Sequence, residues 1–305
     1  MSRRYLIISP VRNEAAYLQR TIDSVVAQTV RPAAWLIVDD GSTDATPDIA
    51  AKAAAQHPWI RLYRRTDRGE RKLGGGVVEA FNDGLSQFDL GEFDYVCKLD
   101  GDLELGPAYF ERLLEKFQAD PRLGTASGKC WLVTENGEEL ERTSDEFSLG
   151  AAKFYRTKCF RQIGGFVREV MWDGIDCHRC RMLGWKAASF HDEALRIRHL
   201  RRMGSSHRSV YAGRLRWGRG QYFMGTYPLY ALAIAVYRML ERPWVIGGLL
   251  ILAGYIGGYI RRAPRYEDEA FRRFLRSWQL GRLGLLGRVL GQPATAGQPV
   301  FRDLR

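Results

Sequence analysis

Two carboxylates, one residue apart, follow directly on a short apolar run: residues 95–99 lead into Asp100-Gly101-Asp102. The run predicts a buried strand that carries both acids to the end of a sheet, where α/β proteins bind their ligands. Carboxylates this close repel each other unless a cation lies between them, and their hard oxygens suit Mg²⁺ or Mn²⁺, which usually also hold substrate phosphates. The motif therefore predicts a metal and diphosphate site, with a turn of two solvated acids as the alternative.

A second pair of acids, Asp173 and Asp176, stands at the start of a segment with a helical pattern that ends at Gly184. The pair could belong to a site. Acids at a helix start can also merely offset the helix dipole, which is worth about 0.3–1 kcal/mol. The residues alone leave both interpretations open.

A basic, glycine-rich segment, residues 68–76, offers a different chemistry. The backbone amides of a glycine loop before a helix attract phosphate, and Arg71 and Lys72 stand within this segment. It lacks the Gly-Lys-Ser/Thr of a Walker A loop. A flexible linker would explain it equally well.

The elements that must position these groups are indicated by the apolar pattern. Residues 5–9 lead into Pro10-Val11-Arg12-Asn13-Glu14, and residues 35–38 lead into Asp39-Asp40-Gly41-Ser42-Thr43-Asp44. Apolar positions at helical spacing follow each loop. Strand, loop and helix thus alternate, which predicts an α/β fold with a doubly wound, mostly parallel, Rossmann-like sheet and right-handed crossovers.

The chain of 305 residues has a formal net charge of +11, and the excess lies in its last third. Residues 201–305 contain 18 Lys and Arg against 5 Asp and Glu, whereas residues 1–200 contain 28 against 30. Such a basic block could bind nucleic acid or an anionic membrane surface. Long apolar runs accompany the charge, which a nucleic-acid face does not need. We therefore expect a membrane surface, and no nucleic acid, as a partner.

Two apolar runs, residues 222–237 and 243–260, are separated by a segment with Arg238 and Arg242. A spanning helix needs about 20 residues, and a hairpin through the membrane would carry both arginines across it. We expect helices that lie in the cytoplasmic leaflet. A single span by the second run, or packing of both runs in a soluble protein, fits the same pattern. An amphipathic stripe within 261–288 predicts a further helix.

The expected domains are residues 1–220, with the sheet, and residues 221–305, with the basic and apolar helices. The first apolar run is too short for the core of a signal peptide. We therefore expect the protein at the cytoplasmic face of the cell membrane.

Taken in order, the motifs resemble those of the inverting family 2 glycosyltransferases, which have the GT-A nucleotide-diphospho-sugar fold, over residues 4–220. The segment 38–44 is very similar to the family's second-strand signature and is the most specific match. Leu99-Asp100-Gly101-Asp102 resembles the metal-binding D-x-D motif. Gly164-Gly165-Phe166, followed by Trp172-Asp173, resembles the segment that carries the catalytic base. The resemblance implies a metal-dependent enzyme that moves a sugar from a nucleotide-sugar donor to a lipid-linked or glycan acceptor, in envelope polysaccharide or glycoconjugate synthesis.

The resemblance also implies roles for single residues. Asp100 would contact the ribose or the metal, and Asp102 would bind the metal through the diphosphate. His199 stands where many family members have a third metal ligand, although a surface histidine in an arginine-rich stretch would look the same. The residues implied to border the nucleobase and ribose are Pro10, Arg12, Glu14, Asp39 and Asp40.

The sequence departs from the family at the base. The family usually shows Glu-Asp, whereas Trp172 stands here in place of the Glu, and Asp176 competes with Asp173. Counting back from Gly184 favours Asp173, with Asp176 supporting the site or capping the helix. Arg216 lies in a segment that partly resembles the Arg-Trp motif of processive relatives, and its forked guanidinium could hold a diphosphate or an acceptor phosphate.

Two other classes of protein fit some of the same features. A non-catalytic nucleotide-binding or RNA-binding protein would use the interleaved Trp, Tyr and Arg of the last third for base stacking. A nucleotidyltransferase of similar fold would normally show a glycine-rich signature with a lysine after the first strand, which residues 10–14 lack.

Overall fold

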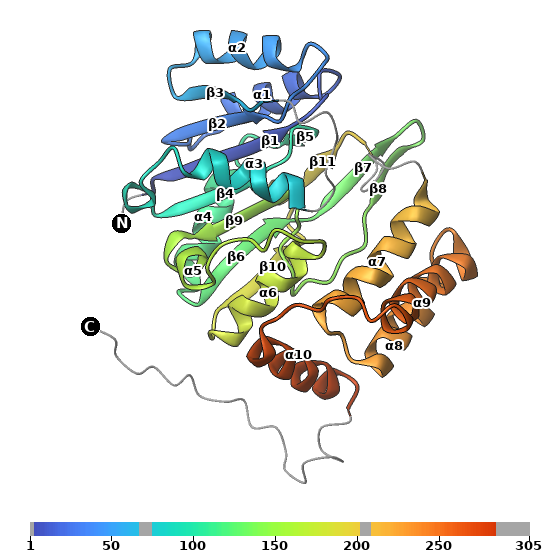
Figure 1. The fold of residues 1–305 in the computed structure, drawn as a ribbon. Coiled ribbons are helices and arrows are strands. Elements are labelled where there is room, and N and C mark those ends of the chain that lie inside the picture. Colours follow the sequence, from blue (N-terminus) through green and yellow to red (C-terminus); the bar gives the residue numbers. More distant parts are fainter. Residues whose placement is uncertain (1–2, 67–74, 202–208, 285–305) are drawn as a thin grey trace. The chain divides into compact units, whose positions relative to one another are not determined.

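A computed structural model of the chain describes residues 3–66, 75–201 and 209–284 (Figure 1). The chain divides into two compact units, residues 1–203 and 204–305. The helix α7 (Val210–Met224) lies wholly in the second unit, so residue 220, the boundary suggested by the sequence, falls inside a helix.

The first unit is built on a seven-stranded sheet with the order β10-β6-β9-β4-β1-β2-β3 (Figure 1). Neighbouring strands pair in parallel, except that β9 is antiparallel to both β4 and β6. The predicted Rossmann-like, mostly parallel sheet is therefore confirmed. Its strands are β1 (Tyr5–Val11), β2 (Ala34–Asp39), β3 (Ile60–Arg64), β4 (Tyr95–Leu99), β6 (Leu123–Gly128), β9 (Ala152–Arg156) and β10 (Lys186–Phe190).

Helices cover both faces of this sheet, which is why its central strands are apolar at nearly every position. Tyr5 and Ile7 of β1 belong to a core shared with α1, α2 and α4, whereas Leu6 and Ile8 belong to a core shared with α3, α5 and α6. The alternation follows from side chains that point to opposite faces of a strand. The helices are α1 (Leu18–Val26), α2 (Thr46–Gln56), α3 (Gly75–Leu85), α4 (Tyr109–Ala119), α5 (Thr157–Gln162) and α6 (Trp172–Met182).

A smaller, four-stranded sheet has the order β5-β11-β7-β8. β11 pairs antiparallel with β5 and parallel with β7, and His199 at its end lies opposite Leu103. The register places the end of β11 beside the residue that precedes β5, which is Asp102. The strands are β5 (Leu103–Leu105), β7 (Cys130–Thr134), β8 (Gly137–Leu140) and β11 (Ile197–His199).

The cysteines all lie in the first unit as free thiols, and all are buried. Burial raises the pKa of the Cys97 and Cys130 thiols well above its usual value. The five residues are Cys97, Cys130, Cys159, Cys177 and Cys180.

In the second unit, glycines let α7 and α9 (Trp244–Ile260) meet backbone to backbone. A β-carbon on Gly218 of α7 would lie 2.0 Å from the Ile251 carbonyl oxygen, and one on Gly254 of α9 would lie 2.1 Å from that of Leu215. Non-bonded atoms do not approach so closely, so only glycine fits at these crossings. The helix α8 (Pro228–Arg238) meets α9 in the same way at Gly248.

Large apolar side chains of α8 and α9 are exposed, among them Leu232, Val236 and Ile246, and Ile260 is 77% exposed. The helix predicted within residues 261–288 is confirmed as α10 (Glu269–Arg282), which buries Phe271 and Leu275. Within the part of the chain that the structure describes, none of the helices has the length and apolar character needed to cross a bilayer.

Candidate active site

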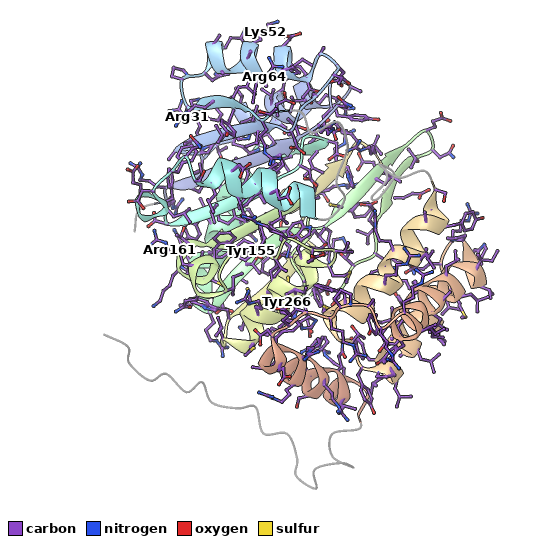
Figure 2. The ribbon with its side chains drawn as sticks, in the orientation of Figure 1. Arg31, Lys52, Arg64, Tyr155, Arg161 and Tyr266 are labelled. Atoms are coloured by element: carbon purple, nitrogen blue, oxygen red, sulfur yellow. The ribbon has the colours of Figure 1, made fainter. Side chains whose placement is uncertain are left out.

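The ends of β1 and β2 lie side by side, because Val11 pairs with Asp39 in the parallel sheet. Asp39 is buried, and its Oδ1 accepts a hydrogen bond of 3.0 Å from the Ser42 amide. Its Oδ2 lies 3.6 Å from Nε of Arg64, the last residue of β3 (Figure 2), and receives no hydrogen bond from the described residues. This oxygen can therefore accept a hydrogen bond from a ligand hydroxyl.

The loops after β1 and β2 are tied into one structure. Asn13 has a positive φ of 54°. Its side-chain Oδ1 accepts a hydrogen bond of 2.8 Å from the Thr43 backbone amide, and its backbone amide donates to Ser42 Oγ. The Glu14 amide donates to Thr46 Oγ1 over 2.8 Å. The two motifs are thus one platform at the carboxyl edge of the sheet, beside Pro10 in β1.

Asp40 differs from Asp39 because the protein already engages its carboxylate. Its Oδ1 accepts a hydrogen bond from Arg65, which also bonds Asp83 over 2.7 Å. Arg12 donates to the Asp40 backbone carbonyl. Arg12 and Asp40 therefore stabilise the platform through contacts within the protein. Arg65 was not among the residues that the sequence indicated.

The first acid of the Asp-Gly-Asp motif is held by a buried lysine. The Asp100 amide donates to the Ala151 carbonyl over 2.8 Å, and Lys98 bridges the Asp100 carboxylate and the Gly150 carbonyl, the latter over 2.7 Å. Burial raises the pKa of the Asp100 carboxyl; Lys98 opposes this shift, and the negative charge of Asp102 adds to it. A cation between the two acids would remove that repulsion.

The second acid, Asp102, is buried against two cationic side chains. Its Oδ2 accepts a hydrogen bond of 2.8 Å from Arg201 Nε and lies 3.7 Å from His199 Nε2. Arg201 also bonds Glu14 over 2.6 Å and so links the Asp-Gly-Asp motif to the platform after β1 and β2. Although burial alone would raise it, the pKa of Asp102 is lowered by its contacts with His199 and Arg201. Asp102 Oδ1 is buried and has no hydrogen-bond partner in the described part of the chain.

His199 is oriented by a third carboxylate. Its Nδ1 lies 2.9 Å from Glu141 Oε2, so its Nε2 faces Asp102. Burial lowers the pKa of this imidazole, but the contacts with Asp102 and Glu141 outweigh it and raise the pKa to about 9. Ligand atoms of Cys130, Glu141 and His199 lie within 4.8 Å of one another. A ligating histidine whose second nitrogen meets a carboxylate is the usual arrangement in metal sites.

These residues fit a divalent cation. The buried Asp102 Oδ1 is an unsatisfied acceptor, and carboxylate oxygens with one imidazole suit Mn²⁺ or Mg²⁺. His199 is 4% exposed, so it is not a histidine of the open surface. Glu141 was not predicted from the sequence.

Asp173 lies in the first turn of α6 and packs on Gly150, the residue that Lys98 holds. A β-carbon on Gly150 would lie 3.0 Å from Asp173 Oδ2. The acids at the end of β4 and at the start of α6 therefore meet at the backbone of Gly150 and Ala151. The half-buried Asp173 carboxylate can reach a ligand at this edge.

Asp176, one turn further on, is fully enclosed. Lys153 Nζ lies 2.5 Å from its Oδ2, and Tyr155 (Figure 2) donates its hydroxyl to the same oxygen. Although burial lowers it, the pKa of Lys153 is raised by the charge of Asp176. Lys153 also donates to the Asp173 carbonyl over 2.8 Å. Asp176 thus fixes α6 beneath Asp173, through a lysine that the sequence analysis did not single out.

Trp172 fills the position where the resemblance suggested a glutamate. Its ring centroid lies 5.4 Å from Lys98 Nζ and 5.6 Å from Lys153 Nζ, so it packs against both buried ammonium groups. Two predicted residues are not among the described residues of the first unit. Arg71 lies outside the described residues, and Arg216 is on α7 in the second unit.

The comparisons with known proteins show the family of the chain. The family model "Glycosyl transferase family 2" matches residues 6–171. Chondroitin synthase of Pasteurella multocida is 35% identical over 117 residues, which are 38% of this chain and 11% of the relative. Poly-beta-1,6-N-acetyl-D-glucosamine synthase of Staphylococcus aureus is 28% identical over 116 residues, 38% of this chain and 26% of the relative. The chain thus matches only a minor part of the length of these relatives.

Solved structures show the same fold. The mannosyltransferase PcManGT from Pyrobaculum calidifontis, in complex with GDP-Man and Mn²⁺, aligns with a TM-score of 0.55 and 18% identity over 95% of this chain and 88% of that chain. TarS from S. aureus, in complex with UDP-GlcNAc, aligns with a TM-score of 0.54 and 17% identity over 89% and 79% of the two chains.

Proposed function

Because the chain belongs to glycosyltransferase family 2, we propose that it transfers a sugar from a nucleoside-diphosphate sugar to an acceptor hydroxyl, with a divalent cation and with inversion at the anomeric carbon. The observation that carries the proposal is that Asp39, Asp102 and Asp173 lie in connected loops at the carboxyl edge of the sheet, with unsatisfied buried oxygens on the first two. Parallel α/β sheets bind nucleotides at this edge.

The platform after β1 and β2 would hold the nucleoside. Asp39 Oδ2 is placed to accept a hydrogen bond from the donor, with Pro10, Arg12 and Glu14 around it and Asp40 fixed by Arg65. Asp102 and His199, with Asp100 beside them, would hold Mg²⁺ or Mn²⁺. A cation held there would supply positive charge against the charge that grows on the departing diphosphate.

The remaining charge on the leaving group requires cationic side chains. Arg201 already touches Asp102 and Glu14 and can turn one edge of its guanidinium to a phosphate. Arg71 and Arg216 keep their predicted role as diphosphate or acceptor-phosphate ligands.

Asp173 would act as the base. The acceptor hydroxyl has a high pKa and needs a carboxylate at about 2.6–3.2 Å to take its proton during attack. A base on the side of the sugar opposite the leaving group gives inversion in one displacement, without a covalent enzyme intermediate. Asp176 is held by Lys153 and Tyr155 and would position α6 instead of taking this proton.

We further propose a lipid-linked or glycan acceptor at the cytoplasmic face of the membrane, in polysaccharide or glycoconjugate assembly. Exposed apolar side chains on α8 and α9, in a unit rich in arginine, support membrane contact. The synthases matched by the chain are named for polysaccharide products, which supports this class of acceptor.

The test is incubation with UDP-, GDP- and dTDP-sugars, Mn²⁺ and a panel of lipid-linked and glycan acceptors. We expect release of the nucleoside diphosphate from at least one donor, a product of inverted anomeric configuration by NMR, and loss of both in Asp102→Ala. If no donor is bound or consumed, or if Asp102→Ala is fully active, the proposal is wrong.

A further inference from the structure

In the second unit, the described residues form a pocket lined by four arginines and one acid. Its cavity volume is about 430 Å³. The arginines that line it are Arg265, Arg272, Arg273 and Arg276, and the acid is Glu269. Glu269 lies 3.6 Å from Arg272 and 3.7 Å from Arg273, and its side chain is 71% exposed, so it offsets little of the positive charge. The pocket therefore keeps a strong excess of positive charge.

Three of the arginines are gathered by one face of α10. Arg272 and Arg276 are four residues apart, and Arg273 and Arg276 are three apart, which places them together on a helix surface. The adjoining face of α10 is anchored, because Phe271 and Leu275 are fully buried. Asp268 caps the helix by accepting a hydrogen bond of 2.9 Å from the Phe271 amide. The helix is thus fixed with its arginines toward the pocket.

The turn after α7 forms another wall. Gly225 has a φ of 88°, and a β-carbon there would lie 3.0 Å from Arg272 Cδ, so the absent side chain makes room for the arginine stem. Arg276 lies over the Tyr227 ring at 5.0 Å from its centroid. Arg265 lies 4.6 Å from the Tyr222 centroid and is also hydrogen-bonded with Tyr222 and Tyr259. Stacking on aromatic rings fixes a guanidinium plane and leaves its N–H edge available to a ligand.

We propose that this pocket is a binding site for a phosphate group. Converging guanidinium forks match phosphate oxygens with paired hydrogen bonds, and a phosphate monoester offers more charge and more acceptor oxygens to four arginines than a carboxylate does. Pro228 and Tyr259 also line the pocket, and each is followed in the sequence by an exposed apolar residue, Leu229 and Ile260. A lipid headgroup and a soluble phosphate compound carry the same chemistry, and the experiment distinguishes them.

The pocket variant is Arg273→Gln/Arg276→Gln in the full chain. Both side chains are exposed, so the fold should tolerate the change, which circular dichroism and thermal melting verify. The control is Arg242→Gln/Arg261→Gln, which removes the same charge from exposed arginines that do not line the pocket. Arg265→Gln serves as a second pocket variant with a single change. All proteins are kept in EDTA, so that binding at the metal-dependent donor site does not contribute.

One arm titrates inorganic pyrophosphate by calorimetry, and the other measures co-sedimentation with vesicles of phosphatidylcholine, alone or mixed with phosphatidylglycerol. A loss of at least about tenfold in affinity in the pocket variants, beyond any loss in the control, supports the proposal in either arm. A specific loss confined to pyrophosphate identifies a soluble phosphate ligand, and one in the vesicle arm identifies a lipid headgroup. If the pocket variants behave like the control in both arms, the proposal is overturned. Neither arm depends on sugar transfer.

Discussion

Two carboxylates one turn apart in α6 have opposite surroundings. Asp173 is half-buried beside Gly150, whereas Asp176 is enclosed by Lys153 and Tyr155. The first can meet a substrate, and the second is fully used by the protein. Substitution of these two residues should therefore separate activity from stability.

Replacing Asp173 with Asn should remove proton transfer while it preserves shape. We expect kcat to fall by about 10²–10⁴, with the affinity for the nucleotide-sugar and the melting temperature unchanged. Steady-state kinetics, donor titration and a thermal melt check the three quantities. Full activity of this variant would contradict the assignment of the base.

Replacing Asp176 with Asn should instead lower the free energy of unfolding. It leaves the Lys153 ammonium buried without its carboxylate, which costs about 3–5 kcal/mol of unfolding free energy. Urea denaturation measures this loss. The double variant Lys153→Met/Asp176→Leu removes both charges and should lie closer to the wild type. A loss no greater than that of Asp173→Asn would show that the pair contributes little.

Glu141 offers a test of the cation site that does not depend on turnover. Glu141→Gln should weaken Mn²⁺ binding by about 10–100-fold, because the carboxylate that orients His199 is gone. Calorimetric titration with Mn²⁺ in the absence of donor gives the affinity. Glu139→Gln, an exposed change in β8 two residues before Glu141, should have no effect. Equal affinities in the two variants would remove Glu141 from the site.

At the scale of elements, the sequence predicted the strands that are buried on both faces and missed those defined by pairing. β1, β2 and β4 are apolar runs and were found where expected. β5 and β11 have three residues each and carry no readable period. The antiparallel insertion of β9 between β4 and β6 depends on long-range contacts that a local pattern does not contain.

The sequence did not identify several residues that support the site, although two of them left a signal in it. Lys98 and Lys153 each interrupt an apolar strand, and a lysine in such a run requires a buried anion. That signal was present in the sequence, and the structure supplies the anions, Asp100 and Asp176. Glu141 and Arg201 carried no comparable signal, because only the small sheet brings them to His199 and Asp102.

The contact between α7 and α9 predicts a sharp contrast between two glycines of one helix. Gly254→Ala would force a methyl group to 2.1 Å from the Leu215 carbonyl oxygen and should cost about 1–3 kcal/mol. Gly257→Ala meets no atom within 4 Å and should stabilise the helix by up to about 1 kcal/mol. Chemical denaturation, followed by helical circular dichroism, compares them. Similar effects at both positions would contradict the close packing.

At the scale of the whole molecule, the order of the motifs predicted the family and the fold, and the match over residues 6–171 confirms the family. The matched segment lies within the first unit, which ends at residue 203. The boundary expected at residue 220 relied on composition, which changes gradually, whereas the units are defined by packing. The arginine pocket was invisible in the sequence, because Gly225, Arg265 and Arg276 meet only through the fold.

The acid stability of the first unit should depend on His178. Burial, with the nearby charges of Arg181 and Lys153, lowers the pKa of His178 well below its usual value. The unfolded chain therefore takes up a proton below about pH 6.5 that the folded protein refuses, and stability falls as the pH drops through this range. His178→Gln should remove up to about 1.4 kcal/mol per pH unit of this dependence. Urea denaturation from pH 7 to 5 gives the slope of stability against pH for the wild type and for His178→Gln. Equal slopes would show that His178 plays no part.

The buried thiols have a practical consequence. All five lie between Cys97 and Cys180, and the sequence from residue 204 onward contains none. An alkylating reagent in solution can modify them only when the first unit opens, and the raised pKa values of Cys97, Cys130, Cys177 and Cys180 keep these four thiols protonated until then. The rate of alkylation therefore reports how often the first unit opens, and it does not report opening of the second unit.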